Sequence, residues 1–317
     1  LRNSLPINQK DLRDIQHTLE DTSDLVRGNR WPAVSKAASR SQFLVNTRKP
    51  DILEAIPNKN KDKGEKILKD LKEDLTSLNE NASQKNKDEF IKIRRKSLQE
   101  IGNIEALLLP EKYPYNIPSE FDNLPRLLGR ASVNIETSKG KMYAIIDGYN
   151  APLTGGAFID LAQKGFYDGL PMNRAEEFFV LQTGDPKGSA IGYIDPETKE
   201  ERHVPLEIKA PGKKETLYNQ TFEEIGLYTE TPILPFATLG TLGWAHSDQA
   251  LDDGSSQFFF FLYEAELNPA GRNLIDGRNA AFGYVVEGEE ILNELGVNDR
   301  IISIDVVAGS ENLLDHA

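Results

Sequence analysis

Three short stretches decide the fold of this chain: residues 172–185 read MNRAEEFFVLQTGD, residues 254–260 read GSSQFFF, and residues 274–283 read LIDGRNAAFG. Their apolar runs are short and are separated by glycine and Asp-Gly turns, which is typical of β-strands joined by tight turns. Because side chains alternate between the two faces of a strand, Phe258 and Phe260 share one face, which we expect to be the core. Phe259 and Phe261 then share the opposite face.

The same pattern extends over the whole region after Arg130. Its expected strands cover residues 131–137, 141–146, 178–182, 239–245, 257–263, 281–286 and 300–307. Two helical stretches, 156–164 and 289–295, interrupt them. Many short strands with two helices predict a closed antiparallel β-barrel that the helices cap.

In this order, the three stretches resemble the cyclophilin family. The resemblance runs from Ala131 to the end of the chain, including the entry NIETSKGKMYAIIDGYNAPLTGGAFIDLAQKGFYDGL at 134–170 and the close AFGYVVEGEEIL at 281–292. It implies an isomerase, or rotamase, that interconverts the cis and trans forms of the peptide bond before proline. That bond has a rotation barrier of about 18–20 kcal/mol, but nothing is cleaved, so we expect neither a cofactor nor a metal.

The resemblance also implies which residues act. In the twisted transition state the prolyl nitrogen gains a lone pair, and Arg174 is the matching guanidinium that donates to it. Gln182 matches the glutamine that hydrogen-bonds the substrate backbone. The other matching positions surround the substrate: Phe179, Val180 and Phe259 in the apolar wall, Ala245 and His246 on the groove floor, and Leu274, Ile275 and Asn279 in the LIDGRN segment.

Each assignment has an ordinary structural alternative. Arg174 could form only a surface ion pair with Glu176 or Glu177, and Gln182 could be a polar contact at a strand edge. A catalytic imidazole is the more specific interpretation of His246. Since isomerisation transfers no proton, we expect the backbone of His246 to contact the peptide instead.

Two residues depart from the family's pattern. Leu274 stands where most single-domain cyclophilins carry a tryptophan, and Asn279 stands where they carry a histidine. Losing the indole removes a large apolar contact and an N–H donor, which the family uses to hold cyclosporin and the substrate. We therefore expect weak cyclosporin binding and low isomerase activity.

Residues 1–109 predict a helical bundle instead of strands. Apolar side chains recur at helical spacing in four segments: 12–26, 29–48, 67–78 and 90–108. The second segment is expected to end before Pro50, because the residue before a proline disfavours helix. Short connections between such helices predict an antiparallel four-helix bundle, and the absence of a Glu-x-x-His pair in these segments argues against a di-metal site.

Two further segments complete the sequence, a connector and an insertion. Residues 110–130 carry four prolines with Tyr113 and Tyr115, and form the expected connector between the bundle and a cyclophilin-like domain at 131–317. Residues 186–236 are longer than the corresponding part of a minimal cyclophilin. A long insertion in a compact domain is usually functional or mobile, and we expect this one near the groove.

Composition and charge limit the partners. The 317 residues include no cysteine, which excludes a disulfide scaffold, a cysteine-ligated metal and a cysteine nucleophile. The first 130 residues carry 24 basic and 20 acidic side chains, and the rest carry 13 and 30, for a net charge of −13. The acidic part disfavours nucleic acid and anionic lipid, and no apolar run approaches the ~20 residues of a membrane span. Attraction between the two parts predicts that they dock, with autoinhibition if the groove is covered.

Motifs of other enzyme classes are missing from the sequence. It has no Gly-x-Ser-x-Gly, no Gly-x-x-x-x-Gly-Lys-Ser/Thr, no Gly-x-Gly-x-x-Gly after a strand and no His-Glu-x-x-His, so hydrolase, kinase and dehydrogenase functions lack support. The acidic loop of Asp248, Asp252 and Asp253 lacks the spacing of an EF-hand. A solvated turn is the better interpretation of that loop than a calcium site.

The order of the parts indicates which group of cyclophilins the chain resembles. A helical bundle, a proline-rich connector and a cysteine-free domain with Leu274 and Asn279 are similar to the multidomain thylakoid-lumen cyclophilins of plants and cyanobacteria. That resemblance implies a thylakoid-lumen or periplasmic location and proline-containing clients, among them photosystem II subunits during assembly. Two functions remain open: a slow isomerase, or a catalytically near-silent binding or chaperone module regulated by its helical domain.

Overall fold

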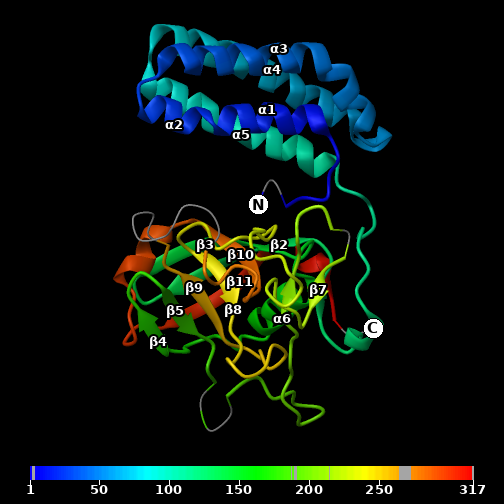
Figure 1. Ribbon diagram of the computed structural model, residues 1–317, viewed down its shortest axis with the longest axis vertical. Helices are drawn as coiled ribbons and strands as arrows, with labels where there is room; N and C mark the ends of the chain where they lie inside the picture. The colour runs from blue at the N-terminus through cyan, green and yellow to red at the C-terminus, as the bar shows by residue number, and fades with distance from the viewer. Residues whose placement is uncertain (2–3, 187, 189–190, 214, 264–272, 316–317) are drawn as a thin grey trace. The chain divides into compact units, whose positions relative to one another are not determined.

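The computed structural model describes residues 1, 4–186, 188, 191–213, 215–263 and 273–315 (Figure 1). The chain divides into two compact units. One unit is helical and spans Ser4–Lys112; the other is rich in strands, spans Tyr113–Ala317 and includes Leu1. No helix among these described residues is both long and apolar enough to cross a membrane.

Five α-helices form the described part of the helical unit. They are α1 (Lys10–Glu20), α2 (Thr22–Arg27), α3 (Trp31–Ala55), α4 (Lys61–Gln84) and α5 (Lys87–Leu107), with a short 3-10 turn η1 at Asn58–Asn60. Contacts link α1 to α3, α3 to α4, α4 to α5 and α5 to α1, so the four long helices surround one core. The expected helical region is therefore present. The expected first helix is divided at Asp21, where the Thr22 hydroxyl donates to the Leu19 carbonyl oxygen at 2.6 Å.

The prediction that a helix ends before Pro50 is wrong, because α3 continues to Ala55. A proline lacks the N–H that would donate to the carbonyl of Asn46, four residues earlier. Both residues are exposed, so water can satisfy that carbonyl. Meanwhile Ile52 and Ile56 are buried in the bundle core, and their burial favours continuation of the helix.

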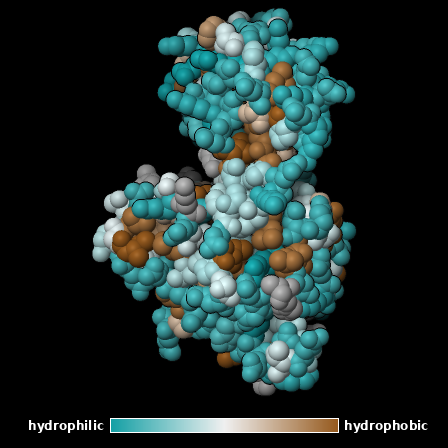
Figure 2. Space-filling model, turned by 90° about the vertical axis from the view of Figure 1, so that its right-hand side faces the viewer, coloured by the Kyte–Doolittle hydropathy of each residue, from teal (hydrophilic) through white to brown (hydrophobic). Residues whose placement is uncertain are grey.

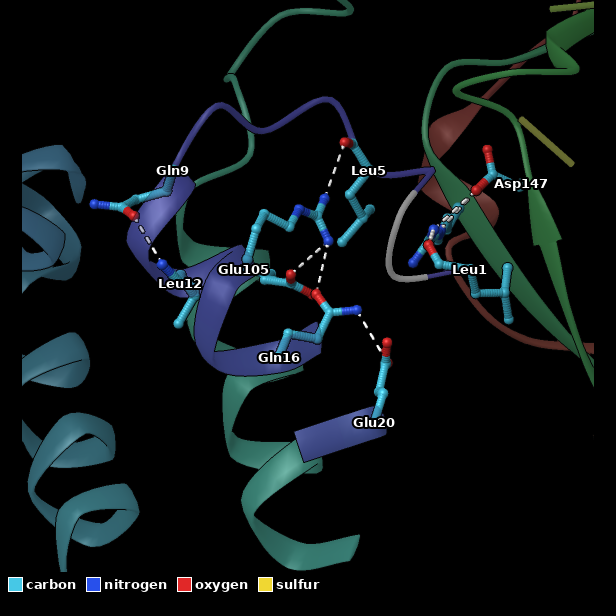
Figure 3. A network of polar contacts seen from close by, with 10 residues as sticks. Leu1, Leu5, Gln9, Leu12, Gln16, Glu20, Glu105 and Asp147 are labelled. Atoms are coloured by element: carbon cyan, nitrogen blue, oxygen red, sulfur yellow. Dashed lines mark hydrogen bonds and ion pairs between the residues drawn. The ribbon is translucent and has the colours of Figure 1, made fainter. Parts of the chain in front are cut away.

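A buried polar network ties α1 to α5 (Figure 3). The Arg13 guanidinium donates to Glu105 at 2.7 Å, to Gln16 at 2.9 Å and to the Leu5 carbonyl at 3.3 Å. Gln16 in turn donates to Glu20 at 3.0 Å. The buried carboxylate is thereby paired, which offsets its loss of hydration. The outer surface of this unit is mostly hydrophilic on the face shown in Figure 2, as expected when the apolar stripes turn inward.

An eight-stranded antiparallel sheet dominates the second unit. Its order is β11-β2-β3-β10-β8-β9-β5-β4. The strands are β2 (Arg130–Thr137), β3 (Gly140–Asp147), β4 (Arg174–Glu176), β5 (Val180–Thr183), β8 (Thr241–Trp244), β9 (Phe258–Phe261), β10 (Ala281–Glu287) and β11 (Ile301–Ala308). Two smaller ladders pair β1 (Arg126–Leu127) with β12 (Leu313–Leu314) and β6 (Glu207–Ile208) with β7 (Leu217–Tyr218). The helix α6 (Pro152–Gln163) is buried from Pro152 to Ala162 and packs on the sheet.

The expected closed barrel is instead a sheet with two edges, β11 and β4. Over the described residues they are joined through the segment before β4, by a bridge between Pro171 and Arg300 and by three backbone hydrogen bonds: from Gly169 to the Ile301 carbonyl, from Ile301 to the Leu170 carbonyl and from Met172 to the Asp299 carbonyl. Pairing therefore continues on both sides of Pro171 but does not include β4 itself.

Two other expectations are corrected. The stretch 289–295 is a 3-10 helix, η3 (Glu289–Glu294), so α6 is the single α-helix in the described part of this unit. The strand expected from residue 178 begins at Val180, because Phe178 takes a left-handed φ of 59° in the turn between β4 and β5. The connector holds the 3-10 turn η2 (Ser119–Phe121) and the strand β1, and a further 3-10 turn, η4 (Ser310–Asn312), precedes β12.

Candidate active site

Three of the expected site residues form one row across neighbouring strands. Arg174 of β4 pairs with Gln182 of β5, and Gln182 pairs with Phe259 of β9. Directly opposed residues of antiparallel strands point to the same face of a sheet. The sheet topology therefore brings together a guanidinium, a carboxamide and an aromatic ring that lie up to 85 residues apart in the sequence.

Arg174 makes the ion pair that its sequence neighbours suggested. Its Nε donates to Glu176 Oε1 at 2.7 Å, and both side chains are about half exposed. The guanidinium carbon also lies 5.9 Å from the ring centroid of Phe179. An exposed pair of this kind contributes only about 0–1 kcal/mol, so the guanidinium can exchange this partner for another.

A second glutamine orients Gln182. The side-chain amide of Gln182 donates to Gln257 Oε1 at 2.8 Å, and Asn173 donates to the same oxygen at 3.0 Å. Gln257 donates to the Ile191 carbonyl at 3.0 Å. Gln257 was missing from the expected site although it belongs to the quoted stretch GSSQFFF, at the start of the expected strand 257–263.

The apolar wall is packed from behind by a residue that sequence reasoning missed. Phe236 stacks on Phe259 with centroids 5.7 Å apart and an interplanar angle of 15°, and Phe259 is only 5% exposed. The backbone N–H of Phe236 donates to Asp276 at 2.8 Å, which fixes its place. Val180 is buried and Phe179 is half-buried. On the opposite face, Phe258 and Phe260 are fully buried, as strand alternation predicts.

The floor residues connect two loops. The Ala245 N–H donates to the Gln257 carbonyl at 3.0 Å. The ring of His246 lies between two carbonyl oxygens, with Nδ1 2.8 Å from that of Ser247 and Nε2 3.0 Å from that of Arg278. This arrangement supports a structural tie and not a reactive histidine. A pocket of about 220 Å³ opens beside Gln182, Ala245 and His246.

The LIDGRN segment is only partly joined to this arrangement. Leu274 is 79% exposed, and Ile275 packs at the edge of the core. Asn279 lines a separate, very small cavity with Asn150 and Lys209. In the acidic loop, Asp253 accepts the N–H of Ser247 at 2.8 Å, and no group of three His, Asp or Glu among the described residues is arranged to hold a metal ion.

Comparison with known proteins decides the family. Residues 132–305 match the family model described as "Cyclophilin type peptidyl-prolyl cis-trans isomerase/CLD". The chain belongs to the cyclophilin family. Its cyclophilin domain is a peptidyl-prolyl isomerase domain, as the three stretches of sequence predicted. Residues 1–109 match a second model, "Peptidyl-prolyl cis-trans isomerase CYP38-like, PsbQ-like domain".

Two relatives of this cyclophilin match it over both parts. A protein of Synechocystis sp. named as a thylakoid lumen peptidyl-prolyl cis-trans isomerase is 43% identical over 99% of this chain and 83% of its own length. The chloroplastic isomerase CYP38 of Arabidopsis thaliana is 38% identical over 99% of this chain and 74% of its own length. A solved cyclophilin from Cryptosporidium parvum is 19% identical, with a TM-score of 0.40, over 56% of this chain and 98% of its own. The locations in the first two names agree with the expected thylakoid-lumen location.

The insertion of this cyclophilin is packed into the domain over its described residues. Glu207 is fully buried and accepts hydrogen bonds from the N–H groups of Leu153 and Thr154 at 3.1 and 3.0 Å, at the start of α6. Burial raises the pKa of Glu207 to about 7, although these hydrogen bonds oppose the rise. Phe222 is also fully buried, and its N–H donates to the Gly277 carbonyl. The insertion therefore belongs to the core as much as to the surface near the groove.

Proposed function

We propose that Arg174 is the catalytic residue of this isomerase and that Gln182 holds the client backbone. The row of Arg174, Gln182 and Phe259 across β4, β5 and β9 supports the proposal most directly. A proline ring against the wall of Phe179, Val180 and Phe259 would have its preceding peptide bond beside the two polar side chains. The reaction then needs no group from outside the chain.

The proposed mechanism is preferential binding of the twisted peptide bond. In the planar bond the nitrogen lone pair is delocalised into the carbonyl and accepts a hydrogen bond poorly. As the bond twists, the lone pair localises on nitrogen and an N–H of Arg174 donates to it. Because this interaction strengthens only in the transition state, it raises the rate and not merely the affinity. Arg174 must first leave Glu176, which costs little at an exposed site.

The other groove residues set how well the client is held. Ala245 and His246 are proposed to contact the peptide through their backbone, with Leu274, Ile275 and Asn279 closing the other side. An exposed leucine in place of an indole offers less apolar contact and no donor. We therefore propose slow turnover and weak cyclosporin binding.

The cellular role we propose is a folding or assembly factor for proline-containing proteins of the thylakoid lumen, among them photosystem II subunits. The names of the relatives and the PsbQ-like match of residues 1–109 support it. The working division is a bundle at 1–109, a connector at 110–130 and a cyclophilin domain at 131–317. The alternative, a near-silent binding module, is favoured by the 5% exposure of Phe259, which limits access of a proline ring.

The test compares Arg174→Ala with Glu176→Gln in a protease-free isomerase assay. If Arg174 donates to the nitrogen, R174A should lower kcat/KM by about 10²–10³, the usual cost of one such donor. E176Q, which frees the guanidinium, should keep or raise the rate. A thermal midpoint close to the wild type in both variants controls for folding. Equal rates in R174A and wild type would reduce Arg174 to a surface ion-pair partner and favour the binding module.

A further inference from the structure

The side chain of His246 connects two segments of the groove that the sheet alone does not hold together. One segment, after β8, carries the groove floor; the other, before β10, is the LIDGRN segment. The pairing of β8 with β10 reaches the N–H of Trp244, which donates to the Ala280 carbonyl at 2.9 Å. Farther from the strands, the Nε2 of His246 lies 3.0 Å from the carbonyl oxygen of Arg278. The ring therefore extends the connection between β8 and β10 into the groove.

Both ring nitrogens of His246 face hydrogen-bond acceptors. Nδ1 lies 2.8 Å from the Ser247 carbonyl oxygen, and Nε2 lies 3.0 Å from that of Arg278. A neutral imidazole has one N–H, so it can donate to only one of these oxygens and turns a lone pair toward the other. An imidazolium has two N–H groups and can donate to both. The geometry therefore fits the protonated ring better than either neutral tautomer.

The surroundings of the ring place an anion close to it. Burial alone would raise the pKa of Asp253, but hydrogen bonds from Ser247 and the nearby His246 outweigh it and hold that pKa below its usual range. Asp253 therefore stays ionised at neutral pH. The guanidinium of Arg278 is paired with Glu223 at 2.7 and 2.8 Å. The charged and titratable groups of the neighbouring segments are Asp248, Asp252 and Asp253 in the loop after β8, Glu201 and His203 in the insertion, and Arg278 with Glu223.

We propose that His246 is a positioning residue of the groove: its protonated ring holds the floor and the LIDGRN segment together, and it holds them less firmly once it loses a proton. The proposal rests on the function proposed above, since it concerns the same groove. Histidine is the side chain whose charge ordinarily changes between about pH 5 and 8. Arg174 lies on β4 and so on neither segment. Protonation should therefore change how tightly the client is held and leave the chemical step nearly unchanged.

The first test measures turnover of a proline peptide without titratable side chains by the full chain, from about pH 5.5 to about pH 8. The wild-type KM should be about 3–10-fold lower at the acidic end, the usual effect of one hydrogen bond, while kcat changes less than about twofold. His246→Gln has an amide that can donate one hydrogen bond at every pH, so its KM should stay near the wild-type value at high pH. His203→Gln is the matched control and should keep the wild-type pH dependence. A pH dependence that persists in H246Q would belong to another group, such as Glu207, and would overturn the proposal.

A second readout follows the contact itself and needs no substrate. The NMR signal of a backbone amide responds to hydrogen bonding of the carbonyl before it, so Asp248 reports on the Ser247 carbonyl and Asn279 on that of Arg278. Both amide signals should shift with the midpoint of the His246 ring, and neither should do so in H246Q. An Asn279 signal that does not follow the ring would overturn the proposal. If both signals follow the ring but no proline peptide is bound or turned over, the proposed function fails and the contact is only structural.

Discussion

At Gly243, the missing side chain makes room for the aromatic wall. A Cβ there would collide with the ring of Phe259 and approach that of Phe236. Gly243→Ala should therefore push Phe259 out of place, at about 1–3 kcal/mol of stability. Misplacing the wall should lower isomerase turnover at least about tenfold. Gly102→Ala is the matched control, since a Cβ at Gly102 meets nothing within 4 Å and alanine favours the helix. Unchanged turnover in G243A would show that the position of Phe259 does not matter.

Leu274 offers a gain-of-function test of the drug site. Its side chain is 79% exposed, so a larger side chain fits there without displacing the core. Leu274→Trp restores an apolar face and an N–H donor, and should tighten cyclosporin binding about tenfold or more, since each 1.4 kcal/mol is tenfold. Calorimetric titration of both proteins measures the change. Tight binding by the unmodified chain would mean that other residues already supply the missing contact.

Arg174, Gln182 and Phe259 were expected together because the sequence resembles the cyclophilin family. The sheet places them on three neighbouring strands, β4, β5 and β9, and their assignment to the site stays a prediction. Phe236 was not predictable, because it precedes its strand within an irregular segment that has no periodicity. Its ring packs on Phe259, and its N–H donates to Asp276, 40 residues away, which no local sequence pattern records.

At the scale of elements, helix ends and sheet edges were the least predictable features. Pro50 predicts the end of a helix, yet α3 continues past it. Burial of the side chains beyond Pro50 stabilises the helix by more than the loss of one backbone hydrogen bond destabilises it. Phe258 and Phe260 of β9 are fully buried as expected, but Phe259 and Phe261 are only 5% and 1% exposed, so four phenylalanines in a row do not by themselves distinguish the core face. Whether the sheet closes depends on how far the pairing with β11 continues from the segment around Pro171 into β4. The pattern of apolar residues does not determine this.

The junction between the insertion and α6 should make the stability of the cyclophilin domain depend on pH. Burial raises the pKa of Glu207 to about 7, whereas a glutamate in an unfolded chain titrates near about 4.3. The folded domain therefore binds the proton of Glu207 more tightly than the unfolded chain does. The stabilisation from this proton is fully present below about pH 4.3 and is lost as the pH rises through 7. Burial lowers the pKa of Lys209 to about 8, so above pH 8 stability should be regained. The midpoint should fall between pH 5 and 7.5, and Glu207→Gln should flatten that fall.

This measurement needs a signal from one unit alone. The chain has two tryptophans, Trp31 in α3 and Trp244 in β8. In a Trp31→Phe background, Trp244 fluorescence reports on the cyclophilin domain. The control is needed because Glu100 in the bundle also has a raised pKa of about 7, through burial and its neighbour Asp74. A midpoint that rises from pH 5 to 7.5 would contradict the assignment to Glu207.

At the scale of the whole molecule, the uneven distribution of charge leads to an expectation about its two units. The first 130 residues have a net charge of +4 and the remainder −17. Opposite charges attract, and interfaces within a chain are commonly polar and about 600–1,500 Å² in size. Attraction of this kind weakens as salt screens it. We therefore expect the two units to dock at low salt and, where docking covers the groove, to suppress turnover.

The choice of fragment decides whether that expectation can be tested. A fragment from residue 131 would lose β1 and its pairing with β12, and would also lose Tyr113, whose hydroxyl donates to the carbonyls of Gly148 and Tyr149 at 3.2 and 3.3 Å. Residues 113–317 keep these contacts and form the compact unit. This fragment should turn over peptides severalfold faster than the full chain at low salt, and the two rates should converge at high salt. Arg174→Ala in both proteins gives the background rate. Equal turnover at both salt concentrations would remove the case for autoinhibition, because a docked bundle that leaves the groove open would leave the rate unchanged.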